Sequence, residues 1–286
     1  MFFLILGSVV VGFLGGYFSG LLGIGGGMVM VPALLFLFYL DGLAPLLAWQ
    51  LAVGSVIAAS VVIDLAVAWL YLRQNSIRWD LVRTFLPGIL LGLLVGTSFS
   101  SLVPGTFVEA GLAFLMMALG LRMLQELPPT DNGESREVAP DPDSEAGLAT
   151  QNDLMQRDDW RLSSLLGIGI GFLGGMSGIG GTILLVPTLI FITGLSVQQS
   201  IATTAATGSL LSLAGSVGLV NAGWHQEILP ADSLGLILPG IIVAMTLGAL
   251  VAIPFGNQQN LAMSHQRLMQ SFGVVLLAGG VEVIWR

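Results

Sequence analysis

Long apolar stretches make up most of the chain, and short polar or Pro- and Gly-containing segments separate them. Several stretches exceed the ~20 residues that an α-helix needs to cross the hydrocarbon core of a bilayer. None of them shows the alternation over ~10 residues that is typical of a transmembrane β-strand. The pattern therefore predicts an all-α polytopic membrane protein. Its helical segments are expected at about residues 3–22, 28–40, 46–72, 81–101, 106–124, 161–177, 183–194, 197–220, 230–253 and 264–285.

The apolar pattern is interrupted between Gln125 and Asp159, where Pro, Asp, Glu, Ser and Asn predominate. A segment of this composition cannot bury a hydrophobic core, and we expect it to be disordered. It divides the chain into a first transmembrane repeat (1–125), an acidic linker (126–159) and a second transmembrane repeat (160–286). We interpret the linker as a solvated connection between the halves. An acidic tether for a partner is the alternative.

A glycine-rich element occurs in each half, at residues 16–32 and at residues 171–187, and the two copies align without a gap. Each glycine in a helix interior costs about 0.5–1 kcal/mol relative to alanine, so neither element is expected to be a continuous helix. Irregular backbone at membrane depth is tolerated where it is buried in protein or lines a cavity, and two breaks at matching places are typical of transporters. The positions expected to shape these breaks are Gly20, Gly23, Pro32, Gly175, Gly178 and Pro187.

The second half repeats the first, and each half has an odd number of crossings. The two repeats, of about five helical segments each, are therefore expected to be inverted relative to each other. The Gly-rich segments are expected to be broken helices or re-entrant half-helices that meet near the midplane. The distribution of arginines predicts that the linker is cytoplasmic and that both termini are outside. Those on the linker side are Arg73, Arg78, Arg83, Arg122, Arg136, Arg157 and Arg161, whereas Arg286 is on the opposite side.

Composition supports the membrane assignment and limits the chemistry. The chain is 55% hydrophobic and 9% charged with a mean hydropathy of +0.90, whereas about 25% of the residues of a soluble domain are charged. The net charge of -8 comes mostly from the linker. Since the chain has no Cys, it forms neither disulfides nor thiolate metal sites, and no metal or cofactor is expected. The N-terminus lacks a basic region and a cleavage site, so we interpret it as the first membrane segment.

No Arg or Lys falls within the predicted membrane depth, so a bound anion has to be held by backbone N–H groups and neutral side chains. Helices that start just after the glycine breaks would direct free N–H groups and the positive ends of their dipoles at a shared point. The candidate substrate-binding residues are Gly25, Gly26, Gly27, Gln50, Ser55, Gly180, Gly181, Thr182, Thr203, Thr204 and Thr207, with Ser200 as a further donor. The alternative for any single Ser or Thr is a hydrogen bond to its own or a neighbouring helix.

Asp64 is the carboxylate expected inside the helix bundle rather than at the end of a segment. An ionisable side chain within the membrane is costly, and it is by default a candidate for function, here as a proton carrier that couples transport. Asp64 lies only about nine residues before Arg73. A position near the interface, without a role in coupling, is therefore the alternative.

The doubled glycine element, the Ala52-Val-Gly-Ser55 sequence and the acidic mid-chain loop resemble the TauE/SafE sulfite exporters, also called the toluene sulfonate uptake permeases. The resemblance covers nearly the whole chain apart from the linker. It implies a bacterial-type inner-membrane carrier of sulfite, of sulfonates such as sulfoacetate, or of related small organic anions. The second half departs from the pattern with Thr203-Thr-Ala205, so the two half-sites are not expected to be chemically equivalent.

Two other functions are open at this stage. Gly175-Met-Ser-Gly178 resembles the Gly-x-Ser-Gly sequence of rhomboid intramembrane proteases, in which Ser177 would be a nucleophile with His225 or His265 as its base. The repeat places Leu22 opposite Ser177, which favours a backbone role, and we do not expect an enzyme. A passive anion channel on the same scaffold is the second alternative. The expected partners are a small anion, the lipid bilayer, protons as coupling ion and a second copy of the chain, without nucleic acid.

Overall fold

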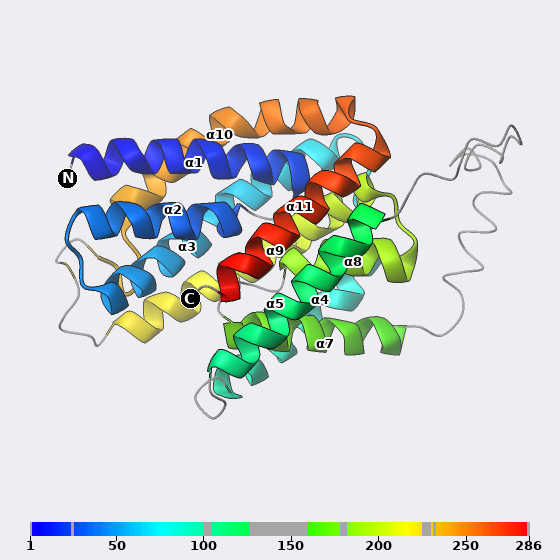
Figure 1. The fold of residues 1–286 in the computed structure, drawn as a ribbon, viewed down its shortest axis with the longest axis horizontal. Helices are drawn as coiled ribbons and strands as arrows, with labels where there is room; N and C mark the ends of the chain where they lie inside the picture. The colour runs from blue at the N-terminus through cyan, green and yellow to red at the C-terminus, as the bar shows by residue number, and fades with distance from the viewer. Residues whose placement is uncertain are drawn as a thin grey trace, which may run out of the picture.

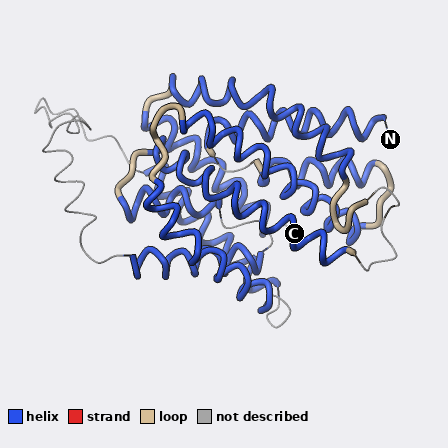
Figure 2. The backbone as a smooth tube through the Cα atoms, turned by 180° about the vertical axis from the view of Figure 1, so that it is seen from behind, coloured by secondary structure: helices blue, strands red, loops and turns tan. Residues whose placement is uncertain are grey.

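The computed structural model describes residues 2–23, 26–99, 105–125, 160–177, 182–224, 230 and 233–284. Within these residues the regular structure is helical, apart from an isolated bridge between Leu234 and Ile237. The prediction of an all-helical protein is confirmed for this part of the chain (Figure 2). The helices are α1 (Phe2–Leu22), α2 (Gly27–Leu40), α3 (Pro45–Leu72), α4 (Trp79–Phe99), α5 (Gly105–Gln125), α7 (Trp160–Ser177), α8 (Thr182–Thr193), α9 (Val197–Gly223), α10 (Pro239–Ala262) and α11 (His265–Ile284).

Five of these helices, α1, α3, α4, α9 and α10, are long and apolar enough to cross a membrane. The helices that follow the glycine breaks are shorter, with 14 residues in α2 and 12 in α8. At 1.5 Å per residue they are about 21 and 18 Å long, which is less than the ~30 Å of a hydrocarbon core. The acidic linker at 126–159 lies outside the described residues.

α1 and α2 form a helical hairpin that reverses at the first glycine break (Figure 1). Gly7 of α1 lies against Leu37 of α2, and Gly15 lies against Met30, so α2 runs back along α1. The chain therefore enters and leaves the bundle on the same side in this pair. A re-entrant hairpin and a pair of tilted half-helices both stay predictions.

The first helix of each half packs closely along the fourth helix of the other half. In the pair α1–α10, a Cβ on Gly16 would meet the backbone of Ala249. In the pair α4–α7, a Cβ on Gly171 would meet the backbone of Ile89. Small residues allow such close approach of helix backbones, which is how helices associate in lipid.

α3 and α9 form the buried centre of the molecule, between the α1–α10 pair and the α4–α7 pair (Figure 1). Leu51 and Ile63 of α3 and Ile201 of α9 are completely buried. Gly215 of α9 lies against Ile57 of α3. A polar side chain at the interface of these two helices is therefore shielded from lipid.

α10 begins at Pro239, later than the segment predicted for residues 230–253. The N–H of Leu234 donates to the carbonyl of Ile237 at 2.9 Å and closes a tight turn before the helix. Leu236 and Ile237 in this turn are buried, which explains their apolar character. Proline is favoured in the first turn of a helix, and Pro239 sets the true start.

Candidate functional site

The described residues that flank the two glycine breaks lie against the same buried helix, α9. Gly23, directly after α1, contacts Ile201 of α9, and Thr182, the first residue of α8, lies beside Gly208 of α9. Ile201 and Gly208 are two helical turns apart, or about 10 Å along the axis. The two breaks therefore approach one short stretch of the central helix.

Gly26 forms the turn of the first break. Its φ of +67° lies in the left-handed region, and a Cβ here would come within 2.7 Å of the carbonyl oxygen of Gly15. A side chain is excluded for both reasons. Gly27, the first residue of α2, faces Val56 of α3, which lies 3.8 Å from the position of a Cβ. Gly25 lies outside the described residues.

The second break is described from Thr182 onwards, where α8 begins. Gly175 lies near the end of α7. Pro187 lies within α8, and Pro32 takes the matching place in α2. Because proline has no N–H, each leaves the carbonyl four residues earlier without its helical partner. The remaining glycines of the second break lie outside the described residues: Gly178, Gly180 and Gly181.

Ser55 and Thr203 contact the starts of two other helices. Ser55 Oγ accepts a hydrogen bond from the N–H of Leu238, the residue before α10, at 3.1 Å. Thr203 Oγ1 accepts one from the N–H of Arg78, the residue before α4, at 3.2 Å. These hydroxyl oxygens satisfy backbone donors at the starts of helices, and each hydroxyl keeps a proton to donate. Their role in binding substrate stays a prediction.

The other hydroxyls of α9 differ in how they are used. Thr207 donates to the carbonyl of Thr203 at 2.8 Å, so its hydroxyl bonds its own helix. Thr204 and Ser200 are completely buried, and their hydroxyls have no hydrogen-bond partner. Thr204 is one turn along α9 from Ile201, the residue that contacts the first break. Thr204, one of the predicted donors, therefore lies near the breaks and has a hydroxyl without a hydrogen-bond partner.

Asp64 is buried between α3 and α9, with 3% of its surface exposed. Ser212 Oγ donates to Asp64 Oδ2 at 3.3 Å, and a Cβ on Gly208 would lie 3.0 Å from the same oxygen and 3.2 Å from Thr182 Cγ2. This geometry places Asp64 beside the start of α8. Gln50 is half-buried and about 21 Å from Asp64 along α3, so these two predicted residues are not brought together.

The structure adds polar residues at the first break that the sequence analysis missed. Asn257 and Asn260 of α10 are buried where α1 ends, and Asn260 Nδ2 donates to the carbonyl oxygen of Leu21 at 2.6 Å. Ser19 of α1 is also completely buried, one turn before the break. Two asparagines three residues apart in an apolar helix can be recognised in the sequence as a candidate buried polar cluster. They were missed because the predicted segment ended at residue 253.

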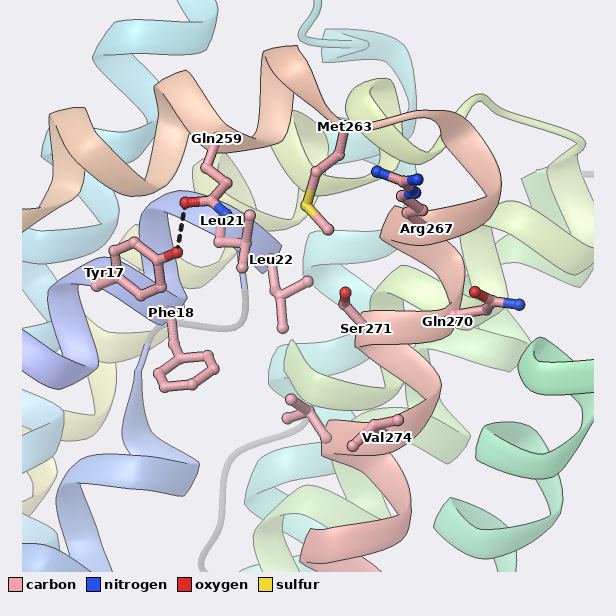
Figure 3. Close-up of a pocket in the computed structure, with 11 residues that line it drawn as sticks. Tyr17, Phe18, Leu21, Leu22, Gln259, Met263, Arg267, Gln270, Ser271 and Val274 are labelled. Atoms are coloured by element: carbon pink, nitrogen blue, oxygen red, sulfur yellow. Dashed lines mark hydrogen bonds between the residues drawn. The ribbon is translucent and has the colours of Figure 1, made fainter.

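A cavity of about 520 Å³ opens between α1, α10 and α11 (Figure 3). Its inner wall includes Leu22, the last residue of α1 before the break. Tyr17 donates its hydroxyl to Gln259 Oε1 at 2.7 Å on one side of the cavity, and Arg267 and Ser271 line the other side. The cavity therefore connects a polar rim to the turn that precedes the first break.

Comparisons with known proteins identify the family to which the chain is similar. The family model described as "Sulfite exporter TauE/SafE" matches residues 8–283. A "Probable membrane transporter protein" of Haemophilus influenzae is 26% identical, covering 99% of both chains. "Probable membrane transporter protein YunE" of Bacillus subtilis is 26% identical, covering 100% of this chain and 98% of the relative. A "Probable membrane transporter protein" of Xylella fastidiosa is 30% identical, covering 95% of this chain and 91% of the relative. No solved structure matches the chain.

Proposed function

Because the chain belongs to the TauE/SafE sulfite exporter family, we propose that it is a secondary transporter of a small sulfur oxyanion, such as sulfite or a sulfonate like sulfoacetate, or of a related organic anion. The observation that carries this proposal is the approach of both glycine breaks to α9, where Thr204 has a buried hydroxyl without a partner. The names of the relatives also describe membrane transporters.

Neutral donors, rather than a fixed cation, hold the anion in this proposal. α2 begins at Gly27 and α8 at Thr182, and the first N–H groups of a helix have no partner within it. They also carry the positive end of the helix dipole, which makes a helix start suited to anions. A sulfonate or sulfite spreads its charge over several oxygens, so several N–H and hydroxyl donors can share it. Arg78 and Arg122 instead lie near helix ends, before α4 and in the last turn of α5.

Asp64 supplies the coupling group of the proposed mechanism. Its carboxyl lies beside the start of α8, which is also the place proposed for the anion. An ionised Asp64 repels an anion there, whereas a protonated Asp64 does not. The anion and a proton then bind together, and the carrier is a proton–anion symporter.

The contacts between helices support an inverted-repeat architecture for this transporter. α1 packs on α10 and α7 packs on α4, and Ser55 and Thr203 make equivalent contacts with the starts of α10 and α4. Such reciprocal contacts are expected for two repeats related by a two-fold axis in the membrane plane. α3 ends and α11 begins at the same end of the molecule (Figure 1), so Arg267 joins Arg73 there. This clustering supports an inner-membrane protein with both termini outside and a cytoplasmic linker.

An uptake assay in proteoliposomes tests the proposal. Labelled sulfite, sulfoacetate, another sulfonate and a carboxylate are offered at two pH gradients, with protein-free liposomes as the control. We expect at least one sulfur oxyanion to accumulate above its external concentration when the outside is more acidic. Failure of every anion to enter overturns the substrate class. Entry that never exceeds the external concentration identifies a passive channel instead of a carrier.

A further inference from the structure

The end of α1 presents oxygens rather than N–H groups to the first glycine break. α1 ends at Leu22, and the carbonyls of the last turn of a helix carry the negative end of its dipole. Ser19 lies in the last turns of α1, Asn257 and Asn260 of α10 lie against them, and none of the three is more than 7% exposed. Ser19 Oγ and the Oδ1 atoms of both asparagines have no hydrogen-bond partner. This combination is unsuited to an anion.

The contact between Asn260 and Leu21 determines which way the Asn260 amide points. The carbonyl oxygen of Leu21 only accepts hydrogen bonds, so the amide atom 2.6 Å from it is the NH₂ group. The Oδ1 atom of Asn260 is then the free acceptor. Asn257 is one turn earlier on α10, and the Cβ atoms of residues so spaced are ~5–6 Å apart. The backbone N of Asn257 is 3.2 Å from the position of a Cβ on Gly20, so both asparagines adjoin the last turns of α1.

Ser19 differs from the other buried serine of α1. Ser8 donates its hydroxyl to the carbonyl of Leu4 at 2.7 Å, as is usual for serine in a membrane helix. Ser19 is equally buried but makes no such bond. A buried acceptor without a partner is destabilising unless something completes it. Three such oxygens beside one helix end therefore indicate a ligand that binds oxygen.

We propose that a Na⁺ ion binds at the end of α1, coordinated by the Oδ1 atoms of Asn257 and Asn260 and by main-chain carbonyls of the last turn. The protein oxygens in this set are neutral, which suits a monovalent cation, whereas Ca²⁺ sites are built with carboxylates. Among the described residues no group of three or more His, Asp or Glu is placed to hold a metal ion. The C-terminal end of an interrupted helix is a place where transporters coordinate Na⁺.

The site goes beyond the proposed function, because it assigns a second ion to the first break whatever the transported anion is. It also makes the two breaks chemically different: the first offers oxygens to a cation, and the second combines Asp64 with the start of α8. The cavity between α1, α10 and α11 is lined by Leu21 and Leu22, the last residues of α1 (Figure 3). A bound Na⁺ would place a positive charge close to the proposed anion.

Thermal unfolding of the purified full-length protein tests the site without any transport. Melting curves are recorded in NaCl, KCl and choline chloride at equal concentration, with no other anion present. Binding to the folded state alone raises the melting temperature, and we expect Tm in NaCl to exceed Tm in choline chloride by about 3 °C or more at saturation. The Asn257→Leu variant should lose this difference. The matched control is Gln258→Leu, an exposed amide on the same helix, which should retain it.

Three results would overturn the proposal. They are an unfolding temperature of the wild type that is the same in NaCl and choline chloride, a full Na⁺ effect in Asn257→Leu, and an equal effect of KCl. Asn260→Leu is a second variant, but it also removes the contact with Leu21 and can lower stability in every salt. The comparison between salts within one variant separates the two effects. Because no substrate is present, failure here is independent of the uptake assay.

Discussion

Ser212 of α9 donates a hydrogen bond to the carboxyl group of Asp64 on α3, with 3.3 Å between Oγ and Oδ2. The contact joins the two central helices beside the start of α8. A carboxylate inside a membrane bundle is costly, and one neutral hydroxyl does not compensate a full negative charge. This environment is the reason for proposing that Asp64 changes its protonation during transport.

Asp64→Asn should remove the dependence of uptake on the pH gradient. Asparagine has the same size and can still accept from Ser212, so insertion and folding should be little changed. Uptake in proteoliposomes at two pH gradients measures the effect, and Asp80→Asn on the exposed first turn of α4 is the control. If Asp64→Asn responds to the gradient like the wild type, the coupling group lies elsewhere.

Gly26→Val should lower transport strongly while leaving insertion intact. Gly26 has a φ of +67°, and a Cβ there would lie 2.7 Å from the Gly15 carbonyl oxygen. Strain of ~1–3 kcal/mol at this turn should lower uptake by about tenfold or more. Gly111→Val is the matched control, because a Cβ at Gly111 has nothing within 4 Å. Comparable uptake by both variants would contradict a role for the geometry of the break.

Cysteine labelling should establish which end of the molecule faces the cytoplasm. The chain has no Cys, so a single introduced thiol reports on one site. An impermeant reagent added to intact cells should label Asp41→Cys, in the loop between α2 and α3. It should not label Ser264→Cys, between α10 and α11, or a cysteine at position 144 in the linker. Labelling of position 144 would reverse the proposed orientation.

The apolar pattern was sufficient to predict the helices, because crossing a bilayer imposes a length and a composition on each segment. The glycine repeat also located both breaks. The apolar pattern failed to give the correct bounds of α10. The buried turn at Leu236 and Ile237 is as apolar as a membrane segment, so the predicted helix began and ended too early. That shift moved Asn257 and Asn260 out of the predicted helix and concealed a buried polar cluster.

Hydrogen-bond partners were beyond sequence reasoning, because they depend on how separate helices meet. Ser55, Thr203, Thr204 and Thr207 look equivalent as hydroxyls in apolar segments. In the structure, Ser55 and Thr203 bind backbone N–H groups of other helices, Thr207 bonds its own helix, and Thr204 has no partner. The four hydroxyl groups therefore differ in their remaining capacity to form a hydrogen bond with a ligand.

Thr204→Val and Thr207→Val form a matched pair that tests where the anion binds. Valine has the shape of threonine without its hydroxyl, both positions are buried on α9, and they are three residues apart. Loss of the unused Thr204 hydroxyl removes a hydrogen bond to the substrate, which is worth about 1 kcal/mol or somewhat more. The apparent affinity for the anion should fall about tenfold.

Thr207→Val should change affinity by less than about twofold, because the Thr207 hydroxyl already bonds the carbonyl of Thr203 at 2.8 Å. Uptake rates over a range of anion concentrations give the apparent affinity of each variant. The two variants are compared at equal amounts of inserted protein. A larger loss of affinity in Thr207→Val than in Thr204→Val would place the substrate away from the unpartnered hydroxyl. The anion would then have to be held chiefly by the starts of α2 and α8.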